Sequence, residues 1–498
     1  MITSIHSFRT HGINPVPVTV ECQVTDGIGI HLVGLADTAV KESILRVATA
    51  LEANGFRIPG KKVIINIAPA DLRKEVLSYD LPIALAIIGA SAQREFIDSD
   101  HYIVAGELTL DGSVRDINGW MQAMELAKQT GRGCVLPYDT AKLAAAIDPH
   151  AEVYGVKSLG DAVGLLTAYS HSRQDGYLAD SIGVKFPEFN CRGAWDAIRG
   201  NFGAKRALEI AAAGGHPVLL VGPQEAHKEN FARALNEILP PLTETERDEV
   251  QRIYSVTGKR IAYGYPPFRS VMFWPILSDL LGGGADTHPG IVSLAHNGVL
   301  YVDGYAVLPN AVKQALRGPV EDGKVSISRL HGKVEYPAKF LPVLGTLPCP
   351  CGHHGENEGC TCTAAQRLNY FAKLSGPVYD RVAVQAWVHP EPETKVPAGE
   401  SVFDVAERVD KARRRQMARQ GCLNNDLHSG AVCQESFVGE AAFEMLNNIV
   451  TRMGLSVRAY AHIIRIARTI ADLEGVEAIT PQHICEASTY RFLDRPAA

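Results

Sequence analysis

The chain has 498 residues, which is too long for one hydrophobic core, so we expect two or three domains. Its 46% hydrophobic and 21% charged residues are typical of a globular protein. Its net charge of -6 excludes a protein that binds nucleic acid over its whole surface. It has no apolar run of membrane-spanning length and no apolar signal segment near its first residue. We therefore expect a cytoplasmic protein that does not bind a membrane.

Residues 1–168 alternate between strand-like and helix-like segments, which predicts one α/β domain. The segment 169–189 that follows is polar and irregular, so we interpret it as a linker. In chain order, the predicted strands cover 18–24, 28–35, 61–69, 102–112 (with a turn) and 134–138, and the predicted helices cover 37–55, 81–93, 120–131 and 158–169.

A second α/β block covers residues 190–395. Strands that alternate with helices predict a parallel sheet, and ligands usually bind at the carboxyl edge of such a sheet. Residues 396–498 are predicted to be mostly helical and to form a lid. The predicted strands of this block are 217–222, 297–303, 339–346 and 382–388, and the predicted lid helices are 440–454, 457–475 and 481–493.

The segment VLLVGPQEAHKENFARAL, residues 218–235, has the strand–loop–helix order of a phosphate-binding loop. Such a loop reads G-x-x-x-x-G-K-[ST], and Gly222 and Lys228 match its first glycine and its lysine. His227 replaces the second glycine, and Glu229 replaces the hydroxyl residue that holds Mg²⁺. The first change restricts the loop backbone, and the second brings negative charge toward a phosphate. The alternatives are a weakened site for ATP and Mg²⁺, and a strand–turn–helix in which Lys228 is only solvated.

A second nucleotide motif is incomplete in the same way. The apolar strand of NGVLYVDGY ends at Asp303, whose carboxylate suits Mg²⁺ held through water. The next residue should be the acid that polarises the attacking water, and it is Gly304. Loss of such a base slows hydrolysis by roughly 10²–10⁴-fold. The structural alternative is a turn at the end of the strand, for which Asp-Gly is a favourable pair.

Nine segments across nearly the whole chain resemble, in order, the Mg-chelatase-type AAA+ ATPases of the bacterial ComM/YifB kind. The resemblance implies three parts: an N-terminal domain of the Lon-protease-like (ribosomal S5 domain 2-like) fold, a central AAA+ P-loop NTPase sheet and a C-terminal helical lid. It also implies assembly into ATP-driven hexameric rings. Within the family, ComM is associated with competence, in which DNA undergoes branch migration during natural transformation. The segments are VGLADTAVKESILRVATAL, NIAPADLRKE, YDLPIALAI, AKRALEIAAAGGHPVLLVGP, SLAHNGVLYVD, RGPVEDGKVSISR, PCPCG, KLSGPVYDR and GLSVRAYAHIIRIARTIADLEG.

The resemblance assigns roles to two arginines. Arg381 matches the finger that reaches the nucleotide of a neighbouring subunit, and Arg458 matches the sensor arginine of the lid. A guanidinium group suits phosphate oxygens, because it binds them with two parallel hydrogen bonds. The alternative for both is an ion pair with a carboxylate such as Asp380.

Other positions depart from the family pattern at its catalytic residues, while the apolar segments match it. We therefore expect a degenerate member: a pseudo-ATPase that acts as a homo-oligomeric ring, or as a mixed ring with a paralogue, in DNA processing. The rival hypothesis is an active ATP-driven DNA motor in which Glu229 holds Mg²⁺. Besides His227, Glu229 and Gly304, the departures are Leu347 for a sensor asparagine, Ile291 for an acid, and Met272 and Phe273 for paired histidines.

Four cysteines crowd into PCPCGHHGENEGCTC. Thiolates in two Cys-x-Cys pairs can hold Zn²⁺ tetrahedrally, and the metal would pin a loop that has no core of its own. Free thiols are the alternative, and a disulfide is not expected in a reducing compartment. The predicted ligands are Cys349, Cys351, Cys360 and Cys362.

The N-terminal domain raises the question of a Ser-Lys protease dyad. Ser78 stands where the nucleophile would lie, but Met121 occupies the place of the lysine. A nucleophile without a base is inert, so we expect no protease activity, and we interpret Ser78 as a residue at the start of a helix.

A basic stretch lies on one predicted helix within residues 409–420. Its side chains either form a solvated helix face or contact DNA phosphates or a neighbouring subunit. The residues are Lys411, Arg413, Arg414, Arg415 and Arg419.

Overall fold

The computed structural model describes most of the chain, and its contacts divide the chain into two units. Unit 1 comprises Met1–Pro187, Gln251–Ile261 and Ser326–Tyr336, and unit 2 comprises Glu188–Val250, Ala262–Val325 and Pro337–Ala498. The predicted boundaries at 168, 189 and 395 stay predictions. The described residues are 2–33, 38–69, 76–167, 184–272, 275–284, 287–329, 332–355, 359–390, 396, 399–427 and 437–494.

Three features of the sequence fall on residues outside these ranges. They are residues 169–183 of the predicted linker, Phe273, and the parts 34–37 and 70–75 of two family-like segments.

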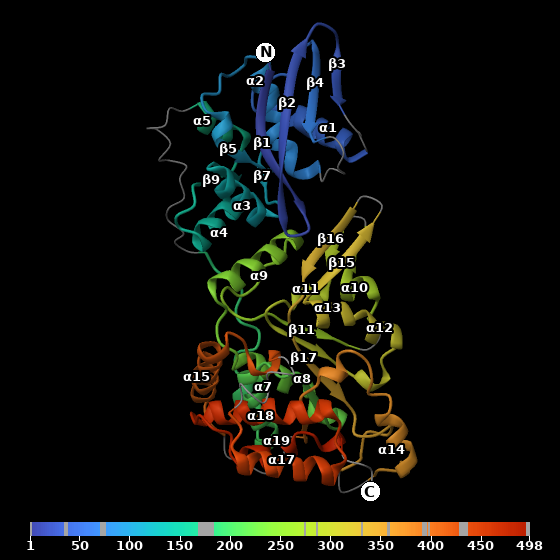
Figure 1. The fold of residues 1–498 in the computed structure, drawn as a ribbon. Coiled ribbons are helices and arrows are strands. Elements are labelled where there is room, and N and C mark those ends of the chain that lie inside the picture. Colours follow the sequence, from blue (N-terminus) through green and yellow to red (C-terminus); the bar gives the residue numbers. More distant parts are fainter. Residues whose placement is uncertain are drawn as a thin grey trace. The chain divides into compact units, whose positions relative to one another are not determined.

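Unit 1 is built on a mixed seven-stranded sheet in the order β3-β4-β2-β1-β5-β8-β9 (Figure 1). The strand β2 pairs antiparallel with β1 and β4, and β5, β8 and β9 continue in parallel from β1. The strands are β1 (Ile2–His11), β2 (Asn14–Thr25), β3 (Gly29–Val33), β4 (Lys62–Ala68), β5 (Tyr102–Val104), β8 (Gly133–Pro137) and β9 (Val153–Val156), with a small pair β6 (Glu107–Leu108) and β7 (Val114–Arg115).

One helix of unit 1, α2 (Asp80–Ala90), is buried along its whole length and is apolar on every side after its first residue. Its first residue, Asp80, is fully buried and accepts a 3.0 Å hydrogen bond from Arg46 Nε. Ser78 lies in the 3-10 turn Val76–Tyr79 just before α2, and Tyr79 occupies the N-cap position of the helix. Burial on all sides explains the absence of a helical period in α2. The other helices are α1 (Thr38–Ala53), α3 (Trp120–Thr130), α4 (Tyr138–Ile147) and α5 (Leu159–Thr167).

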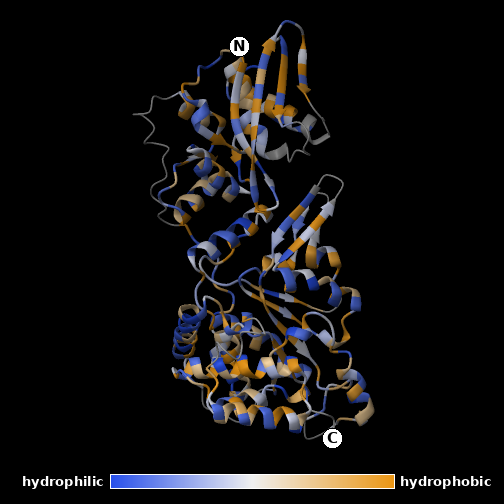
Figure 2. Cartoon of the chain, in the orientation of Figure 1, coloured by the Kyte–Doolittle hydropathy of each residue, from blue (hydrophilic) through white to orange (hydrophobic). Residues whose placement is uncertain are grey.

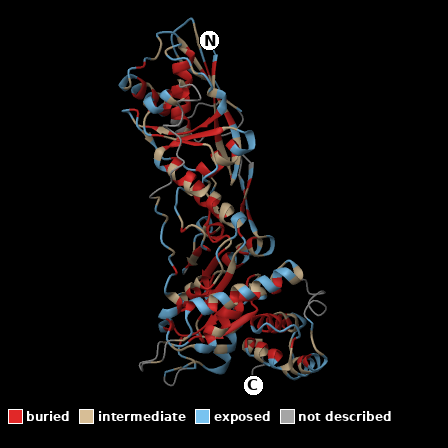
Figure 3. Cartoon of the chain, turned by 90° about the vertical axis from the view of Figure 1, so that its left-hand side faces the viewer, coloured by how far each residue is buried: buried red, intermediate tan, exposed pale blue. Residues whose placement is uncertain are grey.

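Unit 2 contains a five-stranded sheet in the order β11-β14-β17-β10-β18, and all neighbouring strands are parallel. The apolar strands β10, β14, β17 and β18 are mostly buried, as the buried colour of the strands in Figure 3 shows. This confirms the predicted α/β class and its parallel sheet. The strands are β10 (Val218–Val221), β11 (Phe268–Val271), β14 (Val299–Val302), β17 (Leu341–Thr346) and β18 (Val384–Trp387).

Short helices and paired strands join the strands of this sheet. The helix α7 (Phe202–Gly214) precedes β10, α8 (Lys228–Glu237) follows it, and α14 (Ala364–Phe371) precedes β18. The others are α6 (Ala194–Ala197), α9 (Glu244–Thr257), α10 (Leu277–Leu281), β12 (Gly282–Gly283), β13 (His288–Pro289), α11 (Ile291–Leu294), α12 (Asn310–Ala315), α13 (Arg317–Asp322), β15 (Lys324–Arg329) and β16 (Gly332–Pro337).

The C-terminal segment is helical, as predicted. It contains α15 (Val402–Gln420), α17 (Glu440–Met453), α18 (Val457–Glu474) and α19 (Pro481–Thr489). The helix α18 presents an apolar face to the core of unit 2, whereas α15 is mostly hydrophilic (Figure 2). No helix among the described residues is long and apolar enough to cross a membrane.

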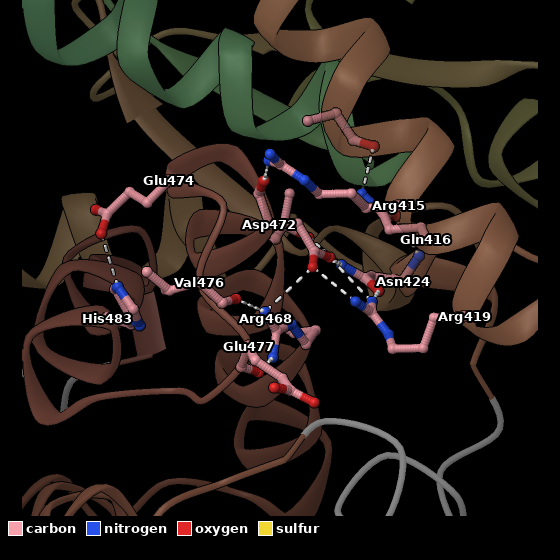
Figure 4. A network of polar contacts seen from close by, with 12 residues as sticks. Arg415, Gln416, Arg419, Asn424, Arg468, Asp472, Glu474, Val476, Glu477 and His483 are labelled. Atoms are coloured by element: carbon pink, nitrogen blue, oxygen red, sulfur yellow. Dashed lines mark hydrogen bonds and ion pairs between the residues drawn. The ribbon is translucent and has the colours of Figure 1, made fainter.

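The basic residues of α15 do not form one solvated face. Arg413 donates to the Ala212 carbonyl oxygen of α7 at 2.8 Å, and Arg419 donates to both carboxylate oxygens of Asp472 at 2.7 and 2.9 Å (Figure 4). Arg415 donates to the Asp472 carbonyl oxygen, whereas the exposed Lys411 and Arg414 pair with acids one turn earlier. Both predictions for this stretch assumed an exposed cationic face, and three of its five side chains instead hold α15 against α7 and α18.

Candidate functional site

The candidate site is a cavity of about 620 Å³ at the carboxyl edge of the parallel sheet of unit 2. The loops that follow β10, β14 and β17 reach it, because parallel strands end at the same edge. Its lining contains Lys228, Asp303, Gly304 and two of the clustered cysteines. The lining residues are Gln224, Lys228, Asp303, Gly304, Val307, Leu347, Pro350, Cys351, Thr361, Cys362, Gln366, Asn369, Tyr370 and Lys373.

Gly222, at the end of β10, is required by a close approach of the backbone. A methyl group at this position would lie 2.3 Å from the carbonyl oxygen of Val388, which continues the neighbouring strand. The glycine of the phosphate-loop pattern thus has a packing role in this fold, and it lies outside the pocket lining.

Lys228 is buried, with 7% of its surface exposed, at the first position of α8. Its Nζ donates hydrogen bonds to the carbonyl oxygens of Gly222 (3.0 Å) and Pro223 (2.7 Å). Burial lowers the pKa of Lys228, and the negative charges of Asp303 and Glu225 oppose that shift. The ammonium group therefore lies inside the loop, at the wall of the pocket, and is not simply solvated.

His227 and Glu229 flank this lysine. The backbone of His227 has a φ of 46°, in the left-handed region that a glycine would occupy without strain. Glu229 lies outside the lining and accepts a 2.7 Å hydrogen bond from Arg233 one turn later in α8. The loop thus turns through a left-handed residue just before α8, while its glutamate is paired with an arginine of the same helix.

Asp303 directly follows β14 and accepts a 2.8 Å hydrogen bond from the Tyr301 hydroxyl. Burial raises the pKa of Tyr301, and the charge of Asp303 adds to the rise. Gly345 on β17 leaves the space for this pair, because a methyl group there would lie 2.4 Å from the hydroxyl oxygen. Gly304 has a φ of 59° and begins the short turn Tyr305–Val307.

The two arginines that the family pattern singles out lie outside the pocket lining. Arg381 Nη1 lies 3.6 Å from a carboxylate oxygen of Glu321, and Arg458 Nη1 lies 3.1 Å from Asp380 Oδ1. Both side chains are partly exposed, at 42% and 61%. In the structure, each therefore has an acidic partner, which is the structural alternative that the sequence left open.

The four clustered cysteines lie together after β17. Their Sγ atoms are all within 4.8 Å of one another, so they could hold one metal ion. The Cys349–Cys351, Cys351–Cys360 and Cys349–Cys360 distances are 3.3, 3.8 and 3.9 Å. A hydrogen bond from the backbone N–H of His353 lowers the pKa of the Cys351 thiol to about 6.

Sequence reasoning did not identify one wall of the pocket. Helix α14 contributes Gln366, Asn369 and Tyr370 to the lining, and Lys373 follows it. The signal that could have found it is Thr363 with Gln366, a capping box before a short amphipathic run. Of the other departures from the family pattern, Leu347 lines the pocket, whereas Ile291 and Met272 do not.

Three family models match successive parts of the chain. Residues 20–140 match the model "Subunit ChlI of Mg-chelatase". Residues 194–396 match "Magnesium chelatase, subunit ChlI", and residues 399–491 match "Magnesium chelatase, subunit ChlI C-terminal".

Full-length relatives agree with these matches. The uncharacterized protein YifB of Escherichia coli is 36% identical over 99% of this chain and 98% of its own length. The competence protein ComM of Haemophilus influenzae is 34% identical over 99% and 97%. The uncharacterized protein Rv2897c of Mycobacterium tuberculosis is 33% identical over 97% of both chains. The chain therefore belongs to the Mg-chelatase-like family that includes YifB and ComM.

Proposed function

We propose that this chain binds a nucleoside triphosphate in the pocket of unit 2 and hydrolyses it slowly or not at all. One observation carries the proposal: Asp303 is the single carboxylate among the described lining residues, and Gly304 follows it. Hydrolysis needs a base to polarise the attacking water. Asp303 is engaged by Tyr301, and the described lining residues include no second acid for that role.

Lys228 is the residue that we expect to face the phosphates. Its Nζ is held by two carbonyl oxygens at the pocket wall, and a phosphate oxygen could replace one of them. Lys373, which also lines the pocket, adds a second positive charge. Magnesium, which the family suggests, would neutralise phosphate charge, and Asp303 is the residue placed to hold it through water.

The rival, an active motor in which Glu229 holds Mg²⁺, has less support. The Glu229 carboxylate is paired with Arg233, and Glu229 does not line the pocket. Magnesium binding by Glu229 would require this pair to open and the side chain to turn.

We also propose that the protein works in DNA processing, as a ring of identical subunits or as a mixed ring with a paralogue. The support is the relative ComM, which is named a competence protein. Arg381 and Arg458 would then exchange their acidic partners for phosphate oxygens. The free energy lost with the present ion pairs is small, because both side chains are partly exposed. Sedimentation of the purified chain with and without ATP tests the ring, and a monomer under both conditions would contradict it.

Calorimetric titration of the full chain with a non-hydrolysable ATP analogue and Mg²⁺ tests nucleotide binding. Lys228→Ala should weaken binding by about tenfold or more, because a hydrogen bond to a charged group contributes about 1.5–3 kcal/mol. Lys411→Ala is the matched control, since its side chain is 59% exposed and pairs with Glu407. Equal affinity of Lys228→Ala and the unaltered chain would contradict the proposal.

A further inference from the structure

The four clustered cysteines have the spacing of a metal site. The Sγ–Sγ distances among Cys349, Cys351 and Cys360 are 3.3, 3.8 and 3.9 Å, and all four atoms lie within 4.8 Å of one another. A tetrahedron with Zn–S bonds of about 2.3 Å has sulfur–sulfur edges of about 3.8 Å. A disulfide requires about 2.05 Å, and the four thiols are free.

We propose that Cys349, Cys351, Cys360 and Cys362 bind one zinc ion, and that this ion holds in place the wall of the pocket formed by residues 347–373. Four sulfur donors select a soft divalent cation over Mg²⁺ or Ca²⁺, which prefer oxygen. On binding, the thiols release their protons and the thiolates form the four bonds to the metal.

The loop that carries the cluster has little packing of its own. Cys349 is buried, but Cys351, Cys360 and Cys362 are only partly buried, and their described neighbours His353, Gly359, Thr361 and Thr363 are exposed. The described residues from 350 to 363 form no helix or strand. A stable position for this loop therefore needs a cross-link, and metal binding supplies one.

The cluster also joins two elements that form the pocket. Cys349 stands three residues after the end of β17, and the Cys362 carbonyl oxygen accepts a 2.9 Å hydrogen bond from Arg367 of α14. Thr363 caps the same helix, because its hydroxyl accepts from the Gln366 backbone N–H at 3.2 Å. A metal bound by all four thiolates would thus fix the start of α14 relative to the end of β17.

Most of the described lining residues belong to this wall, so its position sets the shape of the cavity. Pro350, Cys351, Thr361 and Cys362 come from the cysteine loop itself, and α14 adds the polar side chains of Gln366, Asn369 and Tyr370 to the same lining. The zinc site does not depend on the proposed nucleotide binding. Only an effect of zinc on a bound nucleotide rests on the proposed function.

Metal analysis of the full chain, purified and dialysed with Zn²⁺, tests the site directly. We expect about one zinc per chain, and Co²⁺ in its place should give the visible absorption of a tetrahedral thiolate complex. Cys351→Ser and Cys362→Ser should each lower the retained metal at least several-fold. Cys485→Ser, which changes an exposed cysteine of α19, should retain it fully. No retained metal, or equal loss in Cys485→Ser, would overturn the metal site.

Hydrogen exchange tests the second part of the proposal, that zinc holds the pocket wall in place, and this test needs no nucleotide. Removal of zinc with a chelator should speed amide exchange in α14 several-fold and leave α18 unchanged. Unchanged exchange in α14 would overturn the role in the pocket wall even if zinc is bound. If these results hold while the ATP analogue does not bind, the proposed function fails and the zinc site stands. Oxidation to disulfides, visible as a mass decrease under non-reducing conditions, would overturn the zinc site.

Discussion

The Tyr301 hydroxyl and the Asp303 carboxylate are joined by a 2.8 Å hydrogen bond at the carboxyl end of β14. Tyr301 is buried, and the acceptor is the single carboxylate in the described lining of the pocket. This bond orients the residue that would face magnesium, and it also occupies one oxygen of the single acid in the described lining.

Removal of that hydroxyl should cost more stability than removal of a similar one nearby. We expect Tyr301→Phe to lower the free energy of unfolding by about 1.5–3 kcal/mol, because the acceptor is charged. Tyr305→Phe, whose hydroxyl donates to the Ser375 carbonyl oxygen at 3.1 Å, should cost about 0.5–1.5 kcal/mol. Urea unfolding of both variants measures the difference, and a reversed order would contradict the importance of the pair.

An acid at position 304 should restore hydrolysis if only the base is missing. We expect Gly304→Glu to raise ATP turnover by roughly 10²-fold or more over the unaltered chain. Because Gly304 has a φ of 59°, any side chain there costs roughly 1–2 kcal/mol. Gly304→Ala carries the same strain without the carboxylate and should remain inactive. Equal turnover in the two variants would show that another part of the machinery is also missing.

Asp472 is the centre of the polar network that ties α15 to α18. Its carboxylate accepts from Arg419, from Arg468 at 3.1 Å and from Asn424 at 2.8 Å, and it is 2% exposed (Figure 4). Asp472→Asn leaves buried guanidinium groups without their counter-charge, so we expect a loss of about 3–5 kcal/mol.

The matched control for this network is Asp410→Asn. Asp410 pairs with Arg414 on the exposed side of α15, where the Arg414 side chain is 79% exposed. Such a pair contributes about 0–1 kcal/mol. A thermal unfolding midpoint lowered equally by Asp410→Asn and Asp472→Asn would refute the structural role of the network.

His216 should make the stability of unit 2 depend on pH. It is fully buried, its Nε2 lies 2.8 Å from Thr469 Oγ1, and burial lowers its pKa from the usual 6.5 to about 3. The unfolded chain therefore takes up the proton first as the pH falls. The stabilisation is complete above about pH 6.5 and is lost between about pH 6.5 and pH 3.

Urea unfolding at pH 7 and at pH 5 measures this effect. For each unit by which the pH falls within this range, the free energy of unfolding decreases by up to about 1.4 kcal/mol per buried histidine. His216→Phe should reduce the pH dependence by the share of one histidine, because burial also lowers the pKa of His462 to about 3. His389→Gln, at an exposed position, should leave the pH dependence unchanged. A pH dependence that His216→Phe does not alter would contradict the prediction.

The sequence predicted the central sheet of unit 2 well, because strands buried on both faces appear as short apolar runs between turn residues. Four of its five strands, β10, β14, β17 and β18, lie inside the predicted segments. The edge strand β11 was not predicted, because its FRSV sequence has two half-buried polar residues and no period. The strand β1 of unit 1 was missed for a similar reason, since polar residues interrupt ITSIHSFRTH.

The candidate site could be predicted only in part. Local motifs identified Lys228, Asp303 and the four cysteines, and the structure brings Lys228, Asp303, Cys351 and Cys362 to one pocket. Nothing in the sequence placed the cysteines beside the phosphate loop, because that contact joins segments over a hundred residues apart. The partners of Arg381, Arg458 and Glu229 likewise depend on side-chain geometry, which residue patterns do not fix.

Steady-state ATP turnover of the full, zinc-loaded chain, measured beside analogue binding on the same sample, tests the central claim most directly. The account predicts saturable binding of the analogue with Mg²⁺ that depends on Lys228, together with hydrolysis at or near the background rate. Rapid turnover by the unaltered chain that Lys228→Ala abolishes would contradict it.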